Sequence, residues 1–433
     1  MTQLDRLRAL LATIAQGNRF HAPRLAAAGV DERVASLEEF SARMPFTTKA
    51  DLVADQAAHP PFGSNLTFPL ERYTRFCQTS GTTAKPLVIL DTAESWEWML
   101  GNWARIYRAA GLRAGDRIYF AFSFGPFLGF WTAFEAAARC GFLCIPGGGL
   151  SSAARLRAIA EHEATVLCCT PTYALHLASS AAALAVVSPA GTRPADPAGE
   201  GARSPDDRRG ACATTHSISK IIVAGEPGGS LPGVRERISA AWNGAQVFDH
   251  YGMTEVGPVA FQNEDEDGVL HIIEDSYFAE IVHPQSGAAV PAGEVGELVL
   301  TTLGREACPL LRYRTGDLVK RIAVAPGFAL AGGIIGRADD MVVVRGVNIY
   351  PSAVDAVVRS IPEIAEYRVT VTQDGALAEI ALEVESTSDL AAPLLGSALT
   401  SAFSLRIPVR RVEALPRFEL KARRWVASDS VSP

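Results

Sequence analysis

One run of small and hydroxylated residues with a single lysine has the composition of a phosphate-binding loop: Gln78-Thr79-Ser80-Gly81-Thr82-Thr83-Ala84-Lys85-Pro86. Glycine lets the backbone turn so that its N–H groups converge, the hydroxyls add donors, and Lys85 supplies a positive charge. Such a loop can cradle a polyphosphate. The GxxxxGK(S/T) spacing of a Walker A loop is absent, and an ordinary hairpin turn is the alternative.

Two further motifs place acidic and aromatic side chains beside short apolar runs. They are Asp249-His250-Tyr251-Gly252-Met253-Thr254-Glu255 and Tyr313-Arg314-Thr315-Gly316-Asp317-Leu318. In the first motif, an acidic oxygen, a hydroxyl and an aromatic ring can hold Mg²⁺, a phosphate and a purine. In the second, a carboxylate can accept hydrogen bonds from both ribose hydroxyls. Each motif alone is also typical of a solvated turn.

Two more motifs complete a set of five: Gly336-Arg337-Ala338-Asp339-Asp340-Met341, which runs into VVVRGVNIYP, and Leu415-Pro416-Arg417-Phe418-Glu419-Leu420-Lys421-Ala422. In this order and spacing, the five resemble the adenylate-forming superfamily of acyl-CoA synthetases, carrier-protein adenylation domains and luciferases. GEPGGS (225–230), HYGMTEVGP, ELVLTTLGREACPLLRYRTGDL and GRADDMVVVRGVNIYPSAV are most similar to the phenylacetate-CoA ligase-like branch, in which a benzoate- or anthranilate-CoA ligase is one reading. The resemblance covers residues 40–425, roughly.

The resemblance implies an AMP-forming acid–thiol ligase that uses ATP, Mg²⁺ and coenzyme A. The acid's carboxylate attacks the α-phosphorus of ATP, pyrophosphate leaves, and a thiol then takes the acyl group and releases AMP. Two anions must meet, so cations and preorganised donors are needed. By resemblance, Lys421 lies between carboxylate and α-phosphate, Thr254 touches the α-phosphate, Glu255 holds Mg²⁺, and Lys85 contacts the outer phosphates. These four are the expected catalytic residues.

The resemblance also assigns the rest of the nucleotide site. Tyr251 is expected to stack on adenine, the 225–227 loop to close over its edge, and Asp317 with Arg337 to hold the ribose. The residues expected to bind ATP or AMP are Thr79, Ser80, Gly81, Thr82, Thr83, Lys85, Gly225, Glu226, Pro227, Tyr251, Gly252, Met253, Thr254, Asp317 and Arg337.

Two domains are expected from the same resemblance. Residues 1–337 form an adenylation core that binds acid and ATP, and residues 338–433 form a mobile lid that carries Lys421. In the family, the lid rotates about a hinge aspartate, which Asp339 matches here. The rotation removes the lysine and brings up Val344, Arg345 and Gly346 to line a pantetheine tunnel.

The acid pocket is expected at the aromatic and glycine-rich run FSFGPFLGFW, residues 122–131. Rings with few charges suit a flat aryl acid, although buried rings are often core packing only. His250 can hydrogen-bond a carboxylate or a ring substituent, or serve a structural role. The expected lining is Phe122, Phe124, Gly125, Pro126, Phe127, Phe130, His250, Gly252 and Pro258. Phenylacetate, benzoate and anthranilate stay open, and we favour a small benzoate-type acid such as anthranilate because no sign of a long tunnel is seen.

Two positions depart from the family pattern. Ala84 stands where a glycine usually precedes the lysine, which is tolerable if φ is negative there. Many relatives of this branch bind a structural zinc through cysteines, whereas this chain has 329-ALAG-332 and Gln262-Asn263 at those places. Thiolates hold such a zinc, so we expect none.

The elements that must position these motifs follow from the apolar pattern. Short apolar runs at 118–122, 142–145, 166–169 and 220–224 alternate with helical patterns and predict βα units on a largely parallel sheet. Strands after residue 275 predict an antiparallel subdomain, and the chain after Gly336 predicts a compact α+β unit with a helix starting at Pro351. The expected class is therefore α/β. Residues 189–216, rich in Ala, Pro and Gly, predict a surface loop.

Composition excludes several classes of protein. The chain has 433 residues, 48% of them hydrophobic, and a net charge of −7, so it can form sizeable cores but has no broad basic surface for nucleic acid. Prolines interrupt its one uncharged stretch, so no membrane span is expected. The seven cysteines lack CxxC spacing, and residues 1–16 suit an amphipathic helix better than a signal peptide. We expect a cytoplasmic monomer or homodimer with reduced thiols.

Three functions are compatible with the motifs. The first is an aryl-acid:CoA ligase, which we favour. The second keeps the adenylation but loads a carrier-protein phosphopantetheine, which presents the same thiol. The third is a catalytically silent nucleotide-binding regulator, against which the presence of Lys85, Glu255, Asp317 and Lys421 argues.

Overall fold

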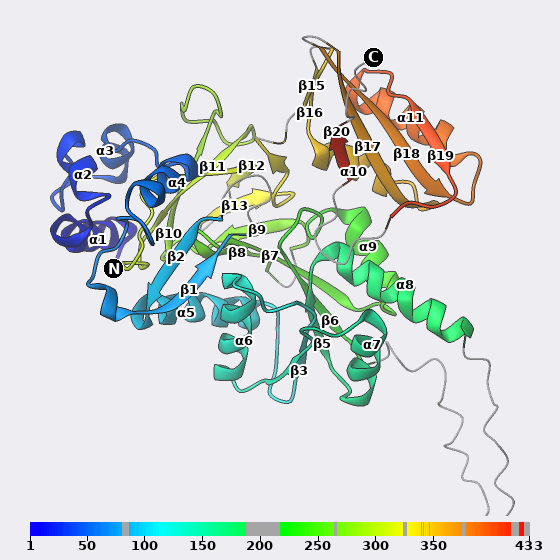
Figure 1. Cartoon of the computed structure of the whole chain (residues 1–433), viewed down its shortest axis with the longest axis horizontal. Coiled ribbons are helices and arrows are strands. Elements are labelled where there is room, and N and C mark those ends of the chain that lie inside the picture. Colours follow the sequence, from blue (N-terminus) through cyan, green and yellow to red (C-terminus); the bar gives the residue numbers. More distant parts are fainter. Residues whose placement is uncertain are drawn as a thin grey trace, which may run out of the picture.

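A computed structural model gives the structure of the chain (Figure 1). It describes residues 1–79, 86–187, 217–263, 266–323, 327–338, 340, 342–345, 347–374, 377–416 and 424–427. Some of the predicted features lie outside these described residues: positions 80–85 of the phosphate loop, the hinge Asp339, Gly346, Lys421, and the whole of the predicted surface loop 189–216.

The chain begins with four short helices that cluster at one end of the molecule (Figure 1). They are α1 (Gln3–Gly17), α2 (Ala22–Ala28), α3 (Leu37–Arg43) and α4 (Lys49–Ala58). The amphipathic helix predicted for the N-terminus is confirmed in α1. Thr2 and Asp5 form a capping box at its start, and Leu7, Leu11 and Ile14 are buried on one face.

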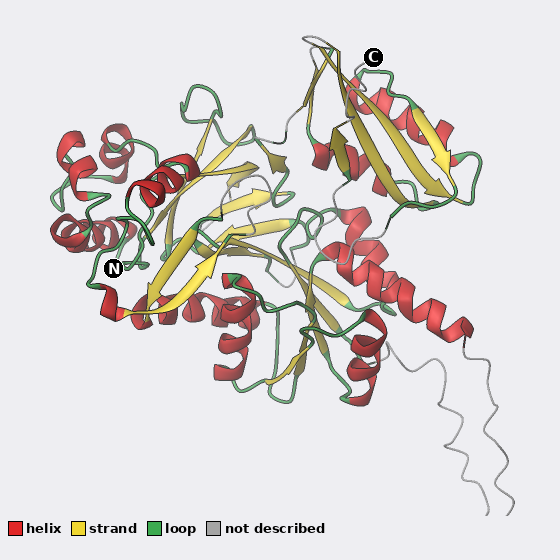
Figure 2. Cartoon of the chain, viewed as in Figure 1, coloured by secondary structure: helices red, strands yellow, loops and turns green. Residues whose placement is uncertain are grey.

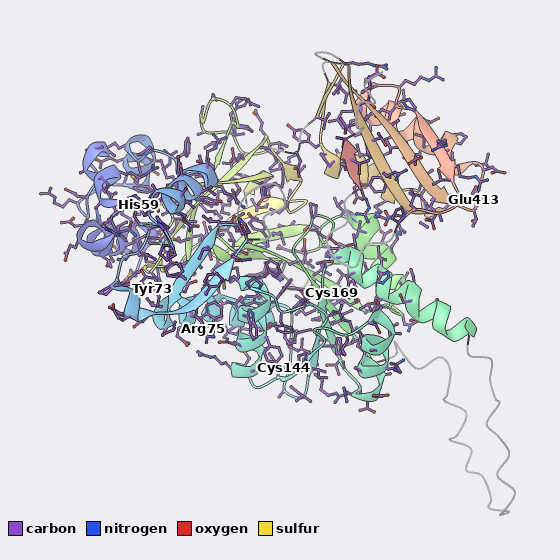
Figure 3. All side chains as sticks on the ribbon, in the orientation of Figure 1. His59, Tyr73, Arg75, Cys144, Cys169 and Glu413 are labelled. Atoms are coloured by element: carbon purple, nitrogen blue, oxygen red, sulfur yellow. The ribbon has the colours of Figure 1, made fainter. Side chains whose placement is uncertain are left out.

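A 3₁₀ turn (Leu70–Arg72) leads into a two-stranded hairpin of β1 (Tyr73–Gln78) and β2 (Val88–Thr92). Tyr73 and Arg75 of β1 are labelled in Figure 3. The Thr79 and Leu87 backbones pair at 3.0 Å, and the Thr79 hydroxyl accepts from the Leu87 N–H at 3.1 Å. The two ends of the predicted phosphate loop are therefore held together.

The central sheet begins with five parallel strands in the order β4-β3-β5-β6-β7. They are β3 (Arg117–Phe120), β4 (Leu143–Pro146), β5 (Val166–Cys169), β6 (Lys220–Val223) and β7 (Gln246–Met253). Two helices pack on one face, α5 (Ala93–Ala109) and α6 (Leu128–Arg139). Three pack on the other, α7 (Ser152–Glu161), α8 (Pro171–Val187) and α9 (Pro232–Ala241) (Figure 2). The predicted βα units are confirmed.

Antiparallel strands continue this sheet rather than forming a separate one. They are β8 (Gly257–Phe261), β9 (Val269–Ile272), β10 (Tyr277–Val282), β11 (Val295–Thr302), β12 (Tyr313–Ala323), β13 (Phe328–Ala331) and β14 (Gly336–Arg337). Strand β7 is parallel to β6 and antiparallel to β8, so it belongs to both parts. The motif of residues 249–255 thus begins on the strand where the two sheet types meet.

The C-terminal part is an α+β unit with its own six-stranded sheet, as predicted. Its elements are β15 (Val342–Val344), β16 (Val347–Ile349), α10 (Pro351–Arg359), β17 (Ile364–Asp374), β18 (Leu377–Ser386), α11 (Ala391–Phe403), β19 (Val409–Val412) and β20 (Trp425–Ala427). Helix α10 packs against α9 (Figure 1). The proposed boundary after residue 337 falls between β14 and β15.

Two expectations from composition concern helices and thiols. No helix within the described ranges has the length and apolarity of a membrane span.

The cysteines that the structure describes are all free thiols, and Cys144 on β4 and Cys169 on β5 are labelled in Figure 3. Burial raises the pKa of the Cys144 thiol to about 11. The thiols of Cys144 and Cys169 are therefore protonated and are not expected to act as nucleophiles.

Candidate active site

The three residues expected to hold the nucleoside lie together. The Tyr251 hydroxyl donates to Asp317 Oδ2 at 2.6 Å, and Arg337 Nη1 donates to Asp317 Oδ1 at 3.1 Å. Asp317 and Arg337 face each other because β12 pairs with β14. Burial, and then the charge of Asp317, raises the pKa of Tyr251 well above its usual value. The strand pairing therefore fixes a carboxylate beside a guanidinium, and the same carboxylate accepts a hydrogen bond from a neutral phenol.

The turn after β7 carries Thr254 and Glu255, and a buried arginine holds its backbone. Arg305 Nη1 donates to the carbonyl oxygens of Thr254, at 3.2 Å, and of Glu255, at 2.7 Å. The same guanidinium makes two hydrogen bonds to Asp91, of 2.8 and 2.5 Å. Asp91 lies on β2, which leaves the predicted phosphate loop. This pair thus fixes the two predicted phosphate-binding segments relative to one another.

Arg305 and Asp91 were not among the residues predicted for the site. A signal was present, because Asp91 directly follows the apolar run Leu87–Leu90 and a charge in such a run needs a partner. Both side chains are essentially inaccessible, with 0% and 1% exposed. What the sequence could not show is which cation, far along the chain, pairs with Asp91.

A second residue missing from the prediction is Lys49, the first residue of α4. Its Nζ lies 3.2 Å from Glu255 Oε1. The Glu255 side chain is 5% exposed and the Lys49 side chain 48%. A lysine in the first turn of a helix is unfavourable for the helix dipole. This was the only weak indication in the sequence that Lys49 has another partner. The expected metal ligand is therefore paired with an ammonium in this structure.

The aromatic run forms a half-buried layer of rings. Phe122 stacks on Phe130 with centroids 4.3 Å apart and planes at 12°. Phe127 meets Phe130 edge-on at 5.9 Å, and Phe124 meets Phe122 edge-on at 5.5 Å. The Pro126 carbonyl accepts from the Gln78 N–H at 2.8 Å, which ties the run to β1. The rings are half-buried, and Phe122 and Phe124 pack against the core cluster of α5 and α6; their role as a pocket wall stays a prediction.

His250 lies on the same side of the sheet as these rings. It contacts Trp103 of α5 edge-on at 4.5 Å, and Phe122 and Phe124 pack against the same cluster. Burial lowers the pKa of His250 to about 3, so the ring is neutral. Its Nδ1 is buried and has no hydrogen-bond partner among the described residues. A neutral, unsatisfied imidazole nitrogen is available to a ligand here.

The backbone of the same hairpin excludes larger side chains at Gly252. A Cβ there would come 2.7 Å from the Gly257 carbonyl oxygen, and Gly252 pairs with Pro258 across β7 and β8. Met253 Sδ lies 3.7 Å from the Tyr251 hydroxyl. The glycine is therefore required for this strand pairing.

The structure also shows the surroundings of other residues that were expected in the site. Glu226 Oε1 accepts from the Thr172 N–H at 2.7 Å, at the start of α8, and Gly225 has a φ of 88°, which favours glycine. Val344 is buried in the C-terminal unit. Arg345 has a φ of 50°, is exposed and pairs with Glu379 at 2.7 Å. The roles given to these residues by resemblance stay predictions.

A hydrogen-bond network occupies the region where relatives were expected to hold zinc. Gln262 is buried, accepts from Arg235 at 2.7 Å and donates to Asp267 at 2.8 Å. Asn263 donates to Glu266 at 3.1 Å. Amide side chains satisfy buried donors and acceptors but are poor zinc ligands. The expected absence of zinc stays a prediction.

Comparison with known proteins identifies the family. The AMP-binding enzyme model matches residues 36–304, and the AMP-binding enzyme C-terminal domain model matches residues 346–428. The chain belongs to the AMP-binding enzymes, in their phenylacetate-CoA ligase-like branch, and is an AMP-forming acid–CoA ligase that uses ATP and CoA. The phenylacetate-coenzyme A ligase of Thermus thermophilus is 32% identical over 88% of this chain and 80% of its own length. That of Escherichia coli is 32% identical over 79% and 72%.

Solved structures give the same fold. A 2-hydroxyisobutyryl-CoA ligase in the postadenylation state superposes with a TM-score of 0.86 at 27% identity, over 99% of this chain and 89% of its own. The same ligase in the thioesterification state scores 0.69 at 28% identity, over 98% and 88%. The arrangement of the two parts in this structure is thus more similar to the postadenylation state.

Proposed function

We propose that this enzyme activates a small aromatic acid of the benzoate, anthranilate or phenylacetate type and transfers the aryl group to CoA. The observation that supports the aromatic substrate is the half-buried stack of Phe122 and Phe130, on the side of the sheet where His250 Nδ1 has no hydrogen-bond partner in the part of the chain that the structure describes. Flat rings favour a flat ligand, and one buried polar atom can orient it.

In the first half-reaction, an oxygen of the acid bonds to the α-phosphorus of ATP. The bond from that phosphorus to the bridging oxygen breaks, and its electron pair leaves with pyrophosphate. In our proposal Asp317 and Arg337 hold the ribose and the Thr254 hydroxyl donates to the α-phosphate. Lys421, outside the described residues, offsets the charge where the two anions meet.

In the second half-reaction, the CoA thiolate attacks the acyl carbon and AMP leaves. We propose that the C-terminal unit rotates about Asp339 between the two steps and that residues 344–346 then line the pantetheine path. Because the rings around Phe122 exclude water from the acid, the adenylate is protected until the thiol arrives.

The proposed Mg²⁺ ligand is Glu255. A buried carboxylate oxygen suits this hard cation, which in nucleotide sites commonly takes one or two protein carboxylates and completes its shell with phosphates and water. When bound, the ion offsets the charge of the polyphosphate.

The test is ATP–pyrophosphate exchange with benzoate, anthranilate, phenylacetate and, as an aliphatic comparison, 2-hydroxyisobutyrate. We expect at least one aromatic acid to give exchange about tenfold faster than the aliphatic acid. Faster exchange with 2-hydroxyisobutyrate would refute the aromatic assignment. Absence of exchange with every acid would instead support the silent regulator.

The acceptor is tested separately. The acid that gives the fastest exchange is supplied with free CoA or with a holo-carrier protein, and thioester is measured. We expect product with CoA. Product with the carrier protein alone would favour the second reading, in which the same phosphopantetheine thiol is presented by a protein.

A further inference from the structure

The contact between Lys49 and Glu255 has a consequence for how ATP is held. Glu255 is the proposed Mg²⁺ ligand, and its carboxylate is 5% exposed with the Lys49 ammonium 3.2 Å away. We propose that Lys49 is a phosphate-binding residue of the adenylation reaction, and that its pairing with Glu255 is the nucleotide-free state of the site. This inference rests on the proposed role of Glu255.

The position of Lys49 is fixed by the chain on both sides of it. The Thr47 N–H donates to the Arg312 carbonyl at 3.0 Å, and the Arg314 N–H donates to the Thr47 carbonyl at 2.9 Å. Thr48 then caps α4, its hydroxyl accepting from the Asp51 N–H at 3.1 Å. The backbone of Lys49 is therefore attached to the beginning of β12, beside Glu255.

The rest of α4 is attached to the strand that leaves the predicted phosphate loop. Gln56 donates to the Val88 carbonyl at 2.5 Å and accepts from the Val88 N–H at 3.0 Å, as a neighbouring strand would. Asp55 accepts from the Ser64 N–H at 2.6 Å and lies 2.9 Å from His59, which is labelled in Figure 3. Helix α4 thus belongs to the wall of the nucleotide site.

The backbone of Glu255 is held close to this helix. Arg305 holds the carbonyl oxygens of the Thr254–Glu255 turn, and Tyr313, whose pKa is raised by burial and then by the Glu255 charge, lies beside the carboxylate. A polyphosphate whose cation reaches Glu255 therefore arrives within reach of the Lys49 ammonium.

The two cations at this turn differ in what they can do. Arg305 is fully buried and makes two hydrogen bonds to Asp91, so its guanidinium has a structural role and is not accessible to a phosphate. Lys49 is half-exposed, and its flexible stem lets the ammonium move from a carboxylate to a phosphate oxygen. Because Tyr251 and Asp317 mark the nucleoside end, we assign Lys49 to the outer phosphates, which leave as pyrophosphate. The positive charge of Lys49 offsets the charge that develops on the leaving oxygen.

The test compares ATP with AMP, because only ATP carries the outer phosphates. Calorimetric titrations are made on the full chain without any acid, using ATP with Mg²⁺, AMP, and pyrophosphate with Mg²⁺. For Lys49→Ala we expect the Kd of ATP and of pyrophosphate to rise about tenfold and that of AMP to change less than twofold. Lys49→Arg should keep most of the ATP affinity.

A matched control removes a positive charge elsewhere in the same N-terminal part. Arg33 is 82% exposed and pairs only with Asp31 among the ion pairs of the described residues, so Arg33→Ala should leave all three affinities unchanged. An unchanged ATP affinity in Lys49→Ala, or equal weakening of ATP and AMP, would overturn the proposal.

A wrong substrate assignment leaves this test intact, because no acid is present. Failure of the wild-type chain to bind ATP with Mg²⁺ would overturn the Lys49 proposal together with the nucleotide site, whereas exchange with 2-hydroxyisobutyrate and with none of the aromatic acids would affect only the proposed substrate.

Discussion

At the scale of single residues, the site depends on buried groups whose charge state is set by their surroundings. Asp249 is 7% exposed and accepts from the Ser230 hydroxyl at 2.5 Å. Burial raises its pKa from 3.8 to about 7. A Cβ on Gly229 would approach the same carboxyl to 2.2 Å, so glycine is needed for it to fit. Next to it, His250 is neutral for the same reason of burial.

Asp249 predicts a particular dependence of stability on pH. The folded chain keeps a proton on this carboxyl that the unfolded chain releases above about pH 4, so the free energy of unfolding contributed by Asp249 falls as the pH rises from about 4 to about 7. The raised pKa corresponds to roughly 4 kcal/mol at most. The variant Asp249→Asn should therefore gain stability relative to wild type as the pH rises through this window, measured by urea unfolding. A difference that is constant from pH 4 to 7 would contradict the shifted pKa.

Candidate site residues could be picked out from the sequence where they lie in a local motif, but not where their partners are distant along the chain. Tyr251, Asp317 and Arg337 come from three separate motifs, and the structure brings them together as their resemblance to a nucleotide site implied. Lys49 and Arg305 were not predicted, because only the tertiary fold brings each of them to its partner. Arg305 and Asp91, for example, are 214 residues apart in the sequence. No local spacing reports such a contact.

At the scale of elements, the hairpin β1–β2 and the turn after β7 are joined by one buried ion pair. The parallel strands β3, β5 and β6 could be predicted from the sequence, because a strand buried on both faces is a continuous apolar run. The sequence did not show that the antiparallel strands continue the same sheet. That continuity depends on β7, which pairs in parallel with β6 on one edge and antiparallel with β8 on the other.

Removing one member of the Asp91–Arg305 pair should destabilise the folded chain. Arg305→Met leaves Asp91 buried without a cation and two carbonyl oxygens without their donor, which predicts a loss of about 3–5 kcal/mol in the free energy of unfolding. The double variant Arg305→Met with Asp91→Leu removes both charges and should recover much of that loss. Urea unfolding of the two variants measures the difference. Equal losses would show that the charge of Asp91 is not what destabilises the single variant.

At the scale of the whole molecule, the contact of α9 with α10 joins the two sheets. Arg237 of α9 lies by Arg359, Asp355 and Glu366 of the C-terminal unit; its Nη1 has no hydrogen-bond partner among the described residues. Burial, and then Arg359, lowers the pKa of Arg237. In the same group, Glu366 pairs with Arg424 at 2.7 Å, just before β20. A desolvated and incompletely paired cation disfavours the arrangement that contains it.

Arg237→Met should therefore favour the arrangement seen here. We expect the ratio of thioester formation to adenylation to fall severalfold, because the C-terminal unit leaves this position less readily. The two half-reactions are measured separately, with Glu236→Gln, an exposed neighbour on α9, as the control. An unchanged ratio would show that Arg237 does not affect the domain equilibrium.

Lys421 gives the second prediction at this scale. Because the lysine is expected near the acid only during adenylation, Lys421→Ala should slow adenylation by about a hundredfold or more. Transfer to CoA from a supplied aryl-adenylate should change little. Single-turnover assays of each half-reaction distinguish the two, and equal losses would mean that the lysine is not specific to the first.

Strand β7 presents consecutive side chains to opposite faces, so His250 turns toward the helices α5 and α6 while Tyr251 turns toward Asp317. The surface that we propose to select the acid and the surface that we propose to bind the nucleotide are therefore on opposite sides of the same strand. On that proposal, we expect substitutions beneath the helices to change which acid is accepted and to leave the residues that bind ATP unchanged, so that one fold can serve several substrates with the same nucleotide chemistry.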